Sequence, residues 1–394
     1  MSTPQLVYVS FDRFPSPKGA STHIAAFAEG LAARFGALEL VTLPGDGPYD
    51  YPGIVHHPLA AQGDTLIARA IDFRKHLAAY LSLRRPDIIH VRSPFEGYPL
   101  ALHKPCQFLV AEINGLPSIE LKYHYRRVAD DVELMRKLRY QERALIEAAD
   151  LVITPSPVTT ELVTRLGARH AYTIPNGVDL DIFHHVPANF DGPQRLRLLF
   201  SGTTTVWQGV HTAIEALALY RRDHEATLTI IGPTRTKQRS RLVELASDFG
   251  VEDSVRILEP VSRAVLARLH HEHDVALAPL LPNDRNLVQG CCPLKVIEAM
   301  AAGPTVVSSD IPAVRALVTH NLDGLLVRPG SAKAIKDALL RLVREHGLGT
   351  RLSRAARSHV VRCLTWRHAS DTLHAQYAQL LSADQPGSMT PPSN

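Results

Sequence analysis

The sequence lacks the features that mark membrane, secreted and metal-binding proteins. Its 394 residues contain no apolar run close to the ~20 residues that a membrane-spanning helix needs. The N-terminal stretch MSTPQLVYVSF has neither a basic segment nor a long apolar core, so it does not resemble a signal peptide. The four cysteines, at positions 106, 291, 292 and 363, have neither disulfide-framework nor zinc spacing. We therefore expect a cytoplasmic protein.

The sequence also lacks a large excess of charge of one sign. The 43 lysines and arginines nearly balance the 39 acidic residues, which leaves a formal net charge of +4. This small excess permits weak peripheral contact with a membrane or with phosphorylated substrates. Because no arginine-rich run or RNA-binding motif is present, we expect no nucleic-acid partner. The charged segment 117–148, predicted as one long helix or a helix pair, is more typical of a solvated face than of a lipid-binding patch.

The length of the chain exceeds that of a usual single hydrophobic core, which predicts two domains. Strand-length apolar runs alternate with amphipathic helices in both halves, and this pattern predicts doubly wound parallel sheets in an α/β fold. We expect an N-terminal domain over 1–184, a Pro/Gly-bearing linker over 185–195, a C-terminal domain over 196–365, a helix over 366–383 that crosses back to the first domain, and a disordered tail over 384–394.

The stretch from Asp274 to Asp310 carries the clearest site pattern. A strand-length run over 275–280 is followed by a polar loop that ends in GCCP, and LKVIEAMAA then shows helical spacing before a glycine. Strand, loop, helix and strand in this order form an open α/β edge, where N–H groups at a helix N-terminus can bind phosphate. Lys295 in the first turn and Glu298 one turn later are therefore candidates for a nucleotide site.

The segments PLKVIEAMAAGPTVVSSDIPAVRALV, DGLLVRPG and IPNGVDLDIF resemble the family 4 retaining glycosyltransferases (group 1 glycosyltransferases) of the GT-B fold. The resemblance covers nearly the whole chain and implies two Rossmann-like domains that face a central cleft. In this family a Glu-x7-Glu motif contacts a nucleotide sugar: its second glutamate binds the ribose hydroxyls and its first touches the transferred sugar. Glu298 matches the second glutamate, but Gly290 stands at the first. Pro293 replaces a loop glycine and removes a backbone donor.

The expected phosphate contacts also differ from the family pattern. Thr203 and Gln208, in the loop after the first strand of the second half, stand where the family has an arginine and a lysine on the diphosphate. Lys295 is the nearest substitute cation, and Arg235 and Lys237 are the alternatives. The predicted donor-binding residues are Gly19, Gly202, Thr203, Gln208, Arg235, Gly290, Cys291, Cys292, Leu294 and Glu298.

Gly19 is the predicted donor contact in the first half. It lies in the loop FPSPKGAS, before a helix predicted from about Thr22 with Ser21 or Thr22 as its cap. The resemblance places this loop near the donor diphosphate and the acceptor, while a simple strand–helix turn accounts for Gly19 equally well.

The predicted strand FLVAEI ends at two further candidates. Glu112 is a polar residue in an apolar strand, so it is either a site residue or a buried ion-pair partner. Asn114 stands where family members often have a catalytic-site histidine. We predict Glu112, Asn114 and Lys295 as the catalytic-site residues. His90, on the preceding strand, is more typical of a satisfied core histidine than of a catalyst.

Two patterns could suggest a metal, and we interpret neither as a metal site. Asp179 and Asp181 form an Asp-x-Asp pair, but they lie in IPNGVDLDIF rather than on a donor loop. The histidines at 270, 271 and 273 are too closely spaced along one helix to converge, and we expect them on the surface. The prediction is a metal-independent enzyme without a cofactor, whose donor substrate is a UDP- or GDP-linked sugar.

Two classes of function fit these observations. The favoured one is a retaining glycosyltransferase that moves a sugar from a nucleotide sugar to a hydroxyl acceptor, lipid-linked or small, in glycan, glycolipid or glycoside biosynthesis. The resemblance implies that the leaving diphosphate accepts the proton of the acceptor, so no protein nucleophile is needed. The alternative is a non-catalytic GT-B module that binds a nucleotide sugar or a partner enzyme, which Thr203, Gln208 and Gly290 favour. A third possibility is a GT-B enzyme with a non-carbohydrate acceptor.

Overall fold

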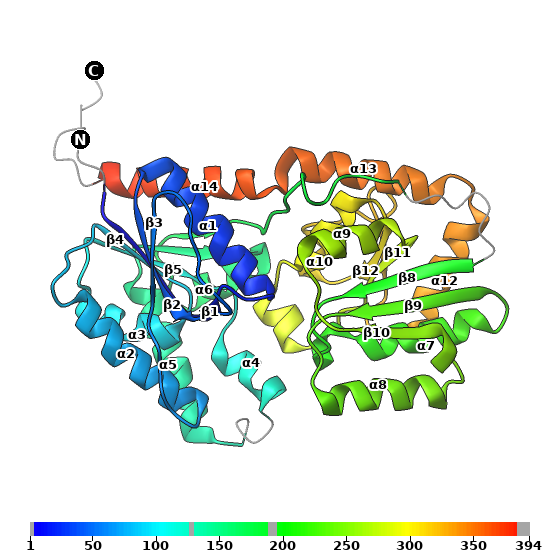
Figure 1. Cartoon of the computed structure of the whole chain (residues 1–394), viewed down its shortest axis with the longest axis horizontal. Helices are drawn as coiled ribbons and strands as arrows, with labels where there is room; N and C mark the ends of the chain where they lie inside the picture. The colour runs from blue at the N-terminus through cyan, green and yellow to red at the C-terminus, as the bar shows by residue number, and fades with distance from the viewer. Residues whose placement is uncertain (1–3, 126–129, 188–194, 384–394) are drawn as a thin grey trace.

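The protein has two α/β halves, each built on one parallel sheet (Figure 1). The computed structural model describes residues 4–125, 130–187 and 195–383. Residues 188–194 of the predicted linker and the predicted tail at 384–394 lie outside the described residues. The two sheets confirm the predicted doubly wound architecture. In the described part of the chain, no helix has the length and apolar character that crossing a membrane requires.

The first half holds a seven-stranded sheet of order β3-β2-β1-β4-β5-β6-β7 in which neighbouring strands are parallel. Its strands are β1 (Leu6–Phe14), β2 (Leu38–Pro44), β3 (Ile54–Pro58), β4 (Ile88–Val91), β5 (Phe108–Glu112), β6 (Leu151–Thr154) and β7 (Ala171–Thr173). Its helices are α1 (Gly19–Phe35), α2 (Leu66–Leu81), α3 (Pro94–His103), α4 (Pro117–His124), α5 (Val132–Ala148) and α6 (Pro157–Arg165). Every residue of β4 and β6 is buried, as expected for parallel strands covered by helices on both faces.

The second half holds a six-stranded parallel sheet of order β10-β9-β8-β11-β12-β13. Its strands are β8 (Arg195–Ser201), β9 (Glu225–Ile231), β10 (Val255–Leu258), β11 (Val275–Ala278), β12 (Thr305–Ser309) and β13 (Leu325–Val327). Its helices are α7 (Val210–Arg221), α8 (Thr236–Asp248), α9 (Arg263–His271), α10 (Leu294–Ala302), α11 (Pro312–Arg315), α12 (Ala332–Arg344) and α13 (Leu348–Cys363), with short turns η2 (Val206–Gln208), η3 (Glu252–Ser254) and η4 (Arg285–Gln289).

The strand order reverses beside the first strand of each sheet, between β1 and β4 and between β8 and β11. In open α/β sheets, ligands bind outside the carboxyl ends of the strands at this point of reversal. The loops after β1 and β8 and the segment after β11 leave their sheets there. The topology therefore positions a site between the two halves.

The last helix, α14 (Trp366–Ala383), lies on the first half of the chain. Figure 1 shows α13 over the second half and α14 continuing along the same side over the first. Leu373 and Tyr377 of α14 are buried in one cluster with Phe27 and Leu31 of α1. The Trp366 ring meets the Phe27 ring edge to face, with 6.4 Å between their centroids. The two halves are thus joined by this helix as well as by the chain near residue 187.

Two predicted helix boundaries differ from the structure. Helix α1 begins at Gly19 rather than near Thr22, and its N-cap is Lys18, whose side chain makes no capping bond. The hydroxyl of Ser21 is not the cap, because it accepts a hydrogen bond from the Ser16 N–H at 2.9 Å. The charged segment forms the helix pair α4 and α5, with residues 126–129 between them outside the described residues.

The surface prediction for the three clustered histidines is wrong for His270. This side chain is fully buried on the inner face of α9, where its ring lies 6.0 Å from that of Phe183. Burial lowers the pKa of His270 to about 3, so the ring is neutral at physiological pH. The spacing of the three histidines does not reveal this, because one turn of an amphipathic helix has both an inward and an outward face.

Candidate functional site

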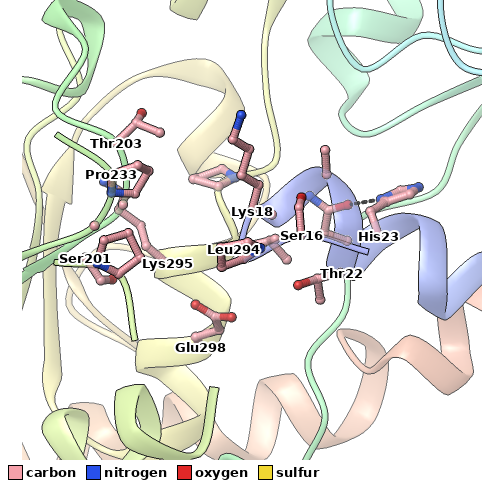
Figure 2. A pocket seen from close by; sticks show the side chains of 18 of the residues that line it. Ser16, Lys18, Thr22, His23, Ser201, Thr203, Pro233, Leu294, Lys295 and Glu298 are labelled. Carbon is pink, nitrogen blue, oxygen red and sulfur yellow. Dashed lines mark hydrogen bonds between the residues drawn. The ribbon is translucent and has the colours of Figure 1, made fainter. Parts of the chain in front are cut away.

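A cavity of about 960 Å³ lies between the two halves, where the family resemblance implies a cleft. Figure 2 shows Ser201, Thr203 and Lys295 on the wall from the second half, and Thr22 and His23 of α1 on the opposite wall. The predicted residues that line this cavity are Gly19, Asn114, Gly202, Thr203, Gln208, Cys291, Cys292, Leu294, Lys295 and Glu298. Residues from both halves therefore converge on one space.

Helix α10 has the predicted limits, Leu294–Ala302. Its last seven residues are all buried, and this burial fixes how the first turn faces the cavity. Gly303 ends the helix with φ of 123°, and a Cβ there would lie 1.9 Å from the Val186 carbonyl oxygen. Only glycine fits such a position. Pro293, at the N-cap, makes no side-chain capping bond, so the first N–H groups of the helix are not satisfied by a cap.

Lys295 places an unpaired cation in the cavity wall. Its Nζ is buried without a hydrogen-bond partner among the described residues and lies 3.8 Å from the centroid of the Phe200 ring. Desolvation lowers the pKa of Lys295 to about 7, although Cys291 and Glu298 oppose the shift. A Cβ on Gly202 would lie 3.0 Å from Nζ, so the glycine leaves room for this ammonium group. An anion in the cavity would satisfy it.

Glu298 and Arg263 lie near each other on the cavity wall formed by the second half. Glu298 lines the cavity, and burial raises the pKa of its carboxyl, against the nearby charges of Arg263 and Lys295. Arg263 is the first residue of α9, and its Nε and Nη2 are buried without a partner among the described residues. A carboxylate beside unpaired guanidinium N–H groups can recognise a ligand that both donates and accepts hydrogen bonds, such as a ribose with its base.

In the loop after β8 the backbone packs closely against a neighbouring loop, and no side chain of the loop carries a charge. Gly202 has φ of 123°, and a Cβ on Gly232 in the neighbouring loop would lie 2.2 Å from the Gly202 carbonyl oxygen. Thr203 lines the cavity, and its hydroxyl bonds that of Thr205 at 3.2 Å. The side-chain oxygen of Gln208 is buried without a partner in the described part of the chain. These groups offer polar contacts but no charge, and the Lys295 ammonium lies beside this loop.

Three of the predicted catalytic-site and donor-binding residues do not line the cavity. Arg235 is the exposed N-cap residue of α8, beyond the loop that contributes Pro233. Gly290 packs against α6: a Cβ there would lie 2.7 Å from the Ser156 hydroxyl, and φ is 81°. A side chain at position 290 would therefore point toward α6, and the donor contact predicted at Gly290 stays a prediction. Glu112 is buried beneath the cavity floor.

Glu112 is the centre of a buried polar network. Its carboxylate accepts hydrogen bonds from Tyr8 at 2.9 Å and from Arg92 Nε at 3.0 Å. It also lies 3.0 Å from His23 Nε2 and 3.1 Å from His90 Nε2. Asn114 donates a further bond to the same carboxylate. Of the two alternatives left open by the sequence, this geometry favours the buried ion-pair partner.

The network shifts the pKa values of Glu112 and His90, which lie beside the cavity wall formed by the first half. Burial would raise the pKa of Glu112, but His23 and Arg92 outweigh it and hold this pKa well below its usual range. His90 is a satisfied core histidine, bonded also to the Tyr377 hydroxyl at 2.6 Å, and burial lowers its pKa. His23, Arg92 and Asn114 line the cavity directly. Glu112 thus orients three residues that a ligand can touch.

Several site residues were not predicted from the sequence. They are Lys18, His23, Arg92, Glu120, His124, Asn176, Arg263 and Arg285, all of which line the cavity. Arg263 could have been found, because it lies in the first turn of a helix that follows a strand, as Lys295 does. Glu120 and Arg285 pair across the two halves at 3.1 Å, and no local pattern links residues 165 positions apart.

Comparison with known proteins agrees with this geometry. The family described as group 1 glycosyl transferases matches residues 195–345, and Glycosyltransferase Family 4 matches residues 17–182. A glycogen synthase of Mycobacterium tuberculosis is 27% identical over 314 residues, which is 78% of this chain and 71% of that protein. The structure of sucrose-phosphate synthase from Thermosynechococcus elongatus superposes with a TM-score of 0.80 at 21% identity, covering 96% of this chain and all (100%) of that one.

A second solved structure, HepE of Anabaena in complex with UDP-glucose, has a TM-score of 0.74 at 16% identity and covers 96% of this chain and 100% of its own. At these identities the solved structures establish the GT-B fold. The two family matches span most of the chain. The protein belongs to the group 1, or family 4, glycosyltransferases and is a glycosyltransferase of the GT-B fold.

Proposed function

We propose that the protein transfers a sugar from a nucleotide-sugar donor to a hydroxyl acceptor with retention of anomeric configuration. Glu298 would bind the ribose hydroxyls, and Lys295 with the N-terminus of α10 would bind the diphosphate. The acceptor would enter from the first half, between α1 and the ends of β4 and β5, where Lys18, His23 and Arg92 line the cavity. The donor in this proposal is a UDP- or GDP-linked sugar, and the solved HepE complex contains UDP-glucose.

The reaction needs one bond exchange and one proton transfer. The bond between the sugar C1 and the diphosphate oxygen breaks as the acceptor oxygen bonds to C1 on the same face. The departing phosphate oxygen takes the acceptor proton. Charge therefore grows on the leaving phosphate in the transition state, where the Lys295 ammonium can stabilise it. His23, held by Glu112 and by Asn176 Oδ1 at 2.7 Å, would orient the acceptor hydroxyl.

The observation that carries this proposal is the buried, unpaired Lys295 ammonium one turn before Glu298. Desolvating a lysine without a partner is unfavourable, and it is retained most simply where a ligand supplies the missing anion. The sequence lacks the arginine and lysine that its family resemblance predicts at Thr203 and Gln208. Lys295 supplies positive charge to the same cavity from a different element.

The direct test is product analysis with the full chain. Purified protein is incubated with UDP-, GDP- and ADP-linked sugars and with polyol, glycoside, sugar-phosphate and lipid-linked acceptors, and products are detected by mass spectrometry. Nuclear magnetic resonance of the product gives its anomeric configuration. Inversion would contradict the retaining mechanism. Binding of a nucleotide sugar without any product would instead favour the non-catalytic module, for which Thr203, Gln208 and Gly290 are the supporting residues.

Glu298→Ala should weaken nucleoside binding even without phosphate. Removing a carboxylate that accepts two ribose hydrogen bonds should raise Kd by roughly 10–100-fold for uridine and for UDP alike. Calorimetry with both ligands measures this. Glu244→Ala, at an exposed position on α8, is the matched control and should leave both affinities unchanged. Unaltered uridine binding by the Glu298 variant would place the ribose elsewhere.

Transfer should not require a divalent ion. No group of three His, Cys, Asp or Glu side chains suited to a metal occurs in the described ranges, and in this proposal Lys295 would supply positive charge to the diphosphate. Treatment with excess EDTA should change the initial rate by less than about twofold, since metal catalysis usually contributes orders of magnitude. If EDTA abolished transfer and Mn²⁺ or Mg²⁺ restored it, this proposal would be wrong.

A further inference from the structure

The cavity contains a carboxylate to which no sequence motif assigns a role. Gly290, at the position of the family's first motif glutamate, faces α6, and a side chain there would run into Ser156 and Val158. Glu120, on α4 of the other half, lines the cavity instead. Its side chain is 28% exposed, so the carboxylate is accessible from the cavity but not freely solvated.

Glu120 is held in one orientation by two residues of η4, the turn that precedes α10. Its Oε1 accepts hydrogen bonds from Arg285 Nε at 3.1 Å and from Gln289 Nε2 at 2.8 Å. Gln289 is itself fixed, because it is fully buried and its Oε1 accepts the Leu116 N–H at 2.8 Å. The carboxylate lies against Gly115, where a Cβ would be 2.7 Å from Oε1 and 2.9 Å from Oε2. No described residue donates a hydrogen bond to Oε2, which leaves one fixed acceptor oxygen unused.

A series of contacts through residues 285–291 connects Glu120 with the Lys295 end of the cavity. Lys295 lies one turn before Glu298 on α10, and Cys291 lies just before that helix, close enough to affect the pKa of Lys295. Burial raises the pKa of Cys291, while the adjacent Arg285 opposes the rise. Arg285 in turn bonds Glu120. In the proposed binding mode the sugar follows the diphosphate at Lys295, on the side of the cavity where Cys291 and Arg285 lead to Glu120.

We infer that Glu120 is the sugar-recognition residue of the donor site, with Oε2 accepting a hydrogen bond from a hydroxyl of the transferred sugar. This inference rests on the proposed function. A residue of the first half thereby does what a side chain at position 290 cannot do. Because α4 belongs to the opposite wall, the sugar contact exists only while α4 is docked on the segment 284–289. Lys122 and Tyr123 of α4 assist the docking through bonds to Asp284.

The test compares a donor with its monodeoxy analogues, using the donor that the product screen selects. We expect the wild-type protein to prefer the complete sugar over one deoxy analogue in kcat/KM by roughly 10–100-fold, the value of one charge-assisted hydrogen bond. Glu120→Ala should abolish that preference by slowing the complete donor while leaving the analogue nearly unchanged. Glu120→Gln, which keeps an acceptor oxygen without the charge, should show an intermediate preference. Affinity for the free nucleoside diphosphate should stay within about twofold of wild type.

Two further variants separate recognition from docking. Lys122→Met removes an α4 contact outside the cavity lining, and it should slow all donors in the same proportion and keep the preference intact. Glu133→Gln, an exposed glutamate of α5 paired with Arg136, should behave as wild type. A preference retained by Glu120→Ala would overturn the inference while leaving the proposed transfer intact.

A binding measurement tests the sugar contact even without turnover. By calorimetry, Glu120→Ala should weaken the nucleotide sugar selectively and leave the nucleoside diphosphate unchanged. Equal weakening of both would show that Glu120 only docks α4. Absence of product with this selective loss still present would count against the transfer reaction but support the sugar contact.

Discussion

Lys295→Met should lower affinity for the nucleoside diphosphate by roughly 100–1,000-fold while leaving nucleoside affinity almost unchanged. Methionine keeps the length and apolar stem of the lysine but has no charge. The Nζ atom has no partner among the described residues, so its removal leaves no protein group unsatisfied. Turnover should fall at least as far, because negative charge on the phosphate increases in the transition state. Calorimetry with uridine and UDP, or with guanosine and GDP, measures the nucleoside and diphosphate affinities separately.

The same variant should change the pH dependence of binding. The pKa of Lys295 is lowered to about 7 in the free protein, and a bound diphosphate would raise it. Between pH 7 and 9 the wild-type protein must therefore take up a proton to bind, and its affinity should fall by up to about tenfold per pH unit. The methionine variant should lack this dependence. Calorimetry in buffers of different ionisation enthalpy detects the proton directly.

The free Lys295→Met protein should also be more stable. The pKa of Lys295 is lower in the folded state than the ~10.4 of an unfolded chain, so the unfolded state binds the proton more tightly. The resulting penalty is complete below pH 7 and disappears as pH rises toward the unfolded pKa. Methionine should thus add about 1–3 kcal/mol at pH 6.5 and much less at pH 10. Lys333→Met, at a side chain 77% exposed, is the control. In the binding experiment with Lys295→Met, an equal loss of affinity for uridine and for UDP would show that Lys295 has a structural role and does not bind the phosphates.

The sequence predicted the parts of the cavity lining that local patterns determine. Helix α10 was predicted to the residue because its apolar spacing ends at a glycine that no other residue can replace. Lys295 and Glu298 followed from their positions in that helix. The start of α1 was misplaced because a backbone turn at Lys18, rather than a hydroxyl, begins the helix.

The remaining site residues depend on contacts between distant segments. The side of the loop on which Gly290 lies is decided by packing against α6, which the motif spacing does not contain. Glu120 meets Arg285 only because the two halves face each other. Likewise, the role of Glu112 became clear only when its partners on β1, β4 and α1 were known.

Glu112→Ala should be the most destabilising single substitution in the first half. The Glu112 carboxylate is 1% exposed and compensates the charge of Arg92, whose side chain is 6% exposed. Arg92 forms a further ion pair with Asp12 at 2.6 Å. Removing the Glu112 carboxylate leaves a buried guanidinium with only that partly exposed partner. The free energy of unfolding should fall by roughly 3–5 kcal/mol, as for other broken buried ion pairs. Glu112→Gln should lose less, since it can still accept a bond from Tyr8.

The destabilisation can be assigned to the first half by fluorescence. The chain has two tryptophans, and Trp366 contacts His23 and Phe27, so a Trp207→Phe background leaves a reporter beside the network. Urea titration of that background with and without Glu112→Ala gives the change. The exposed Glu133→Gln variant should leave the midpoint in place.

The pH dependence distinguishes a charge effect from a packing effect. Because the folded pKa of Glu112 lies well below that of an unfolded glutamate, its stabilisation is complete above the unfolded value of about 4.3 and is lost as pH falls through the folded value. Wild type and Glu112→Ala should therefore converge in acid. The double variant Glu112→Leu/Arg92→Met should be more stable than Glu112→Ala, because it removes both buried charges together. If the double variant were instead the least stable of the three, lost packing rather than an unpaired charge would be the cause.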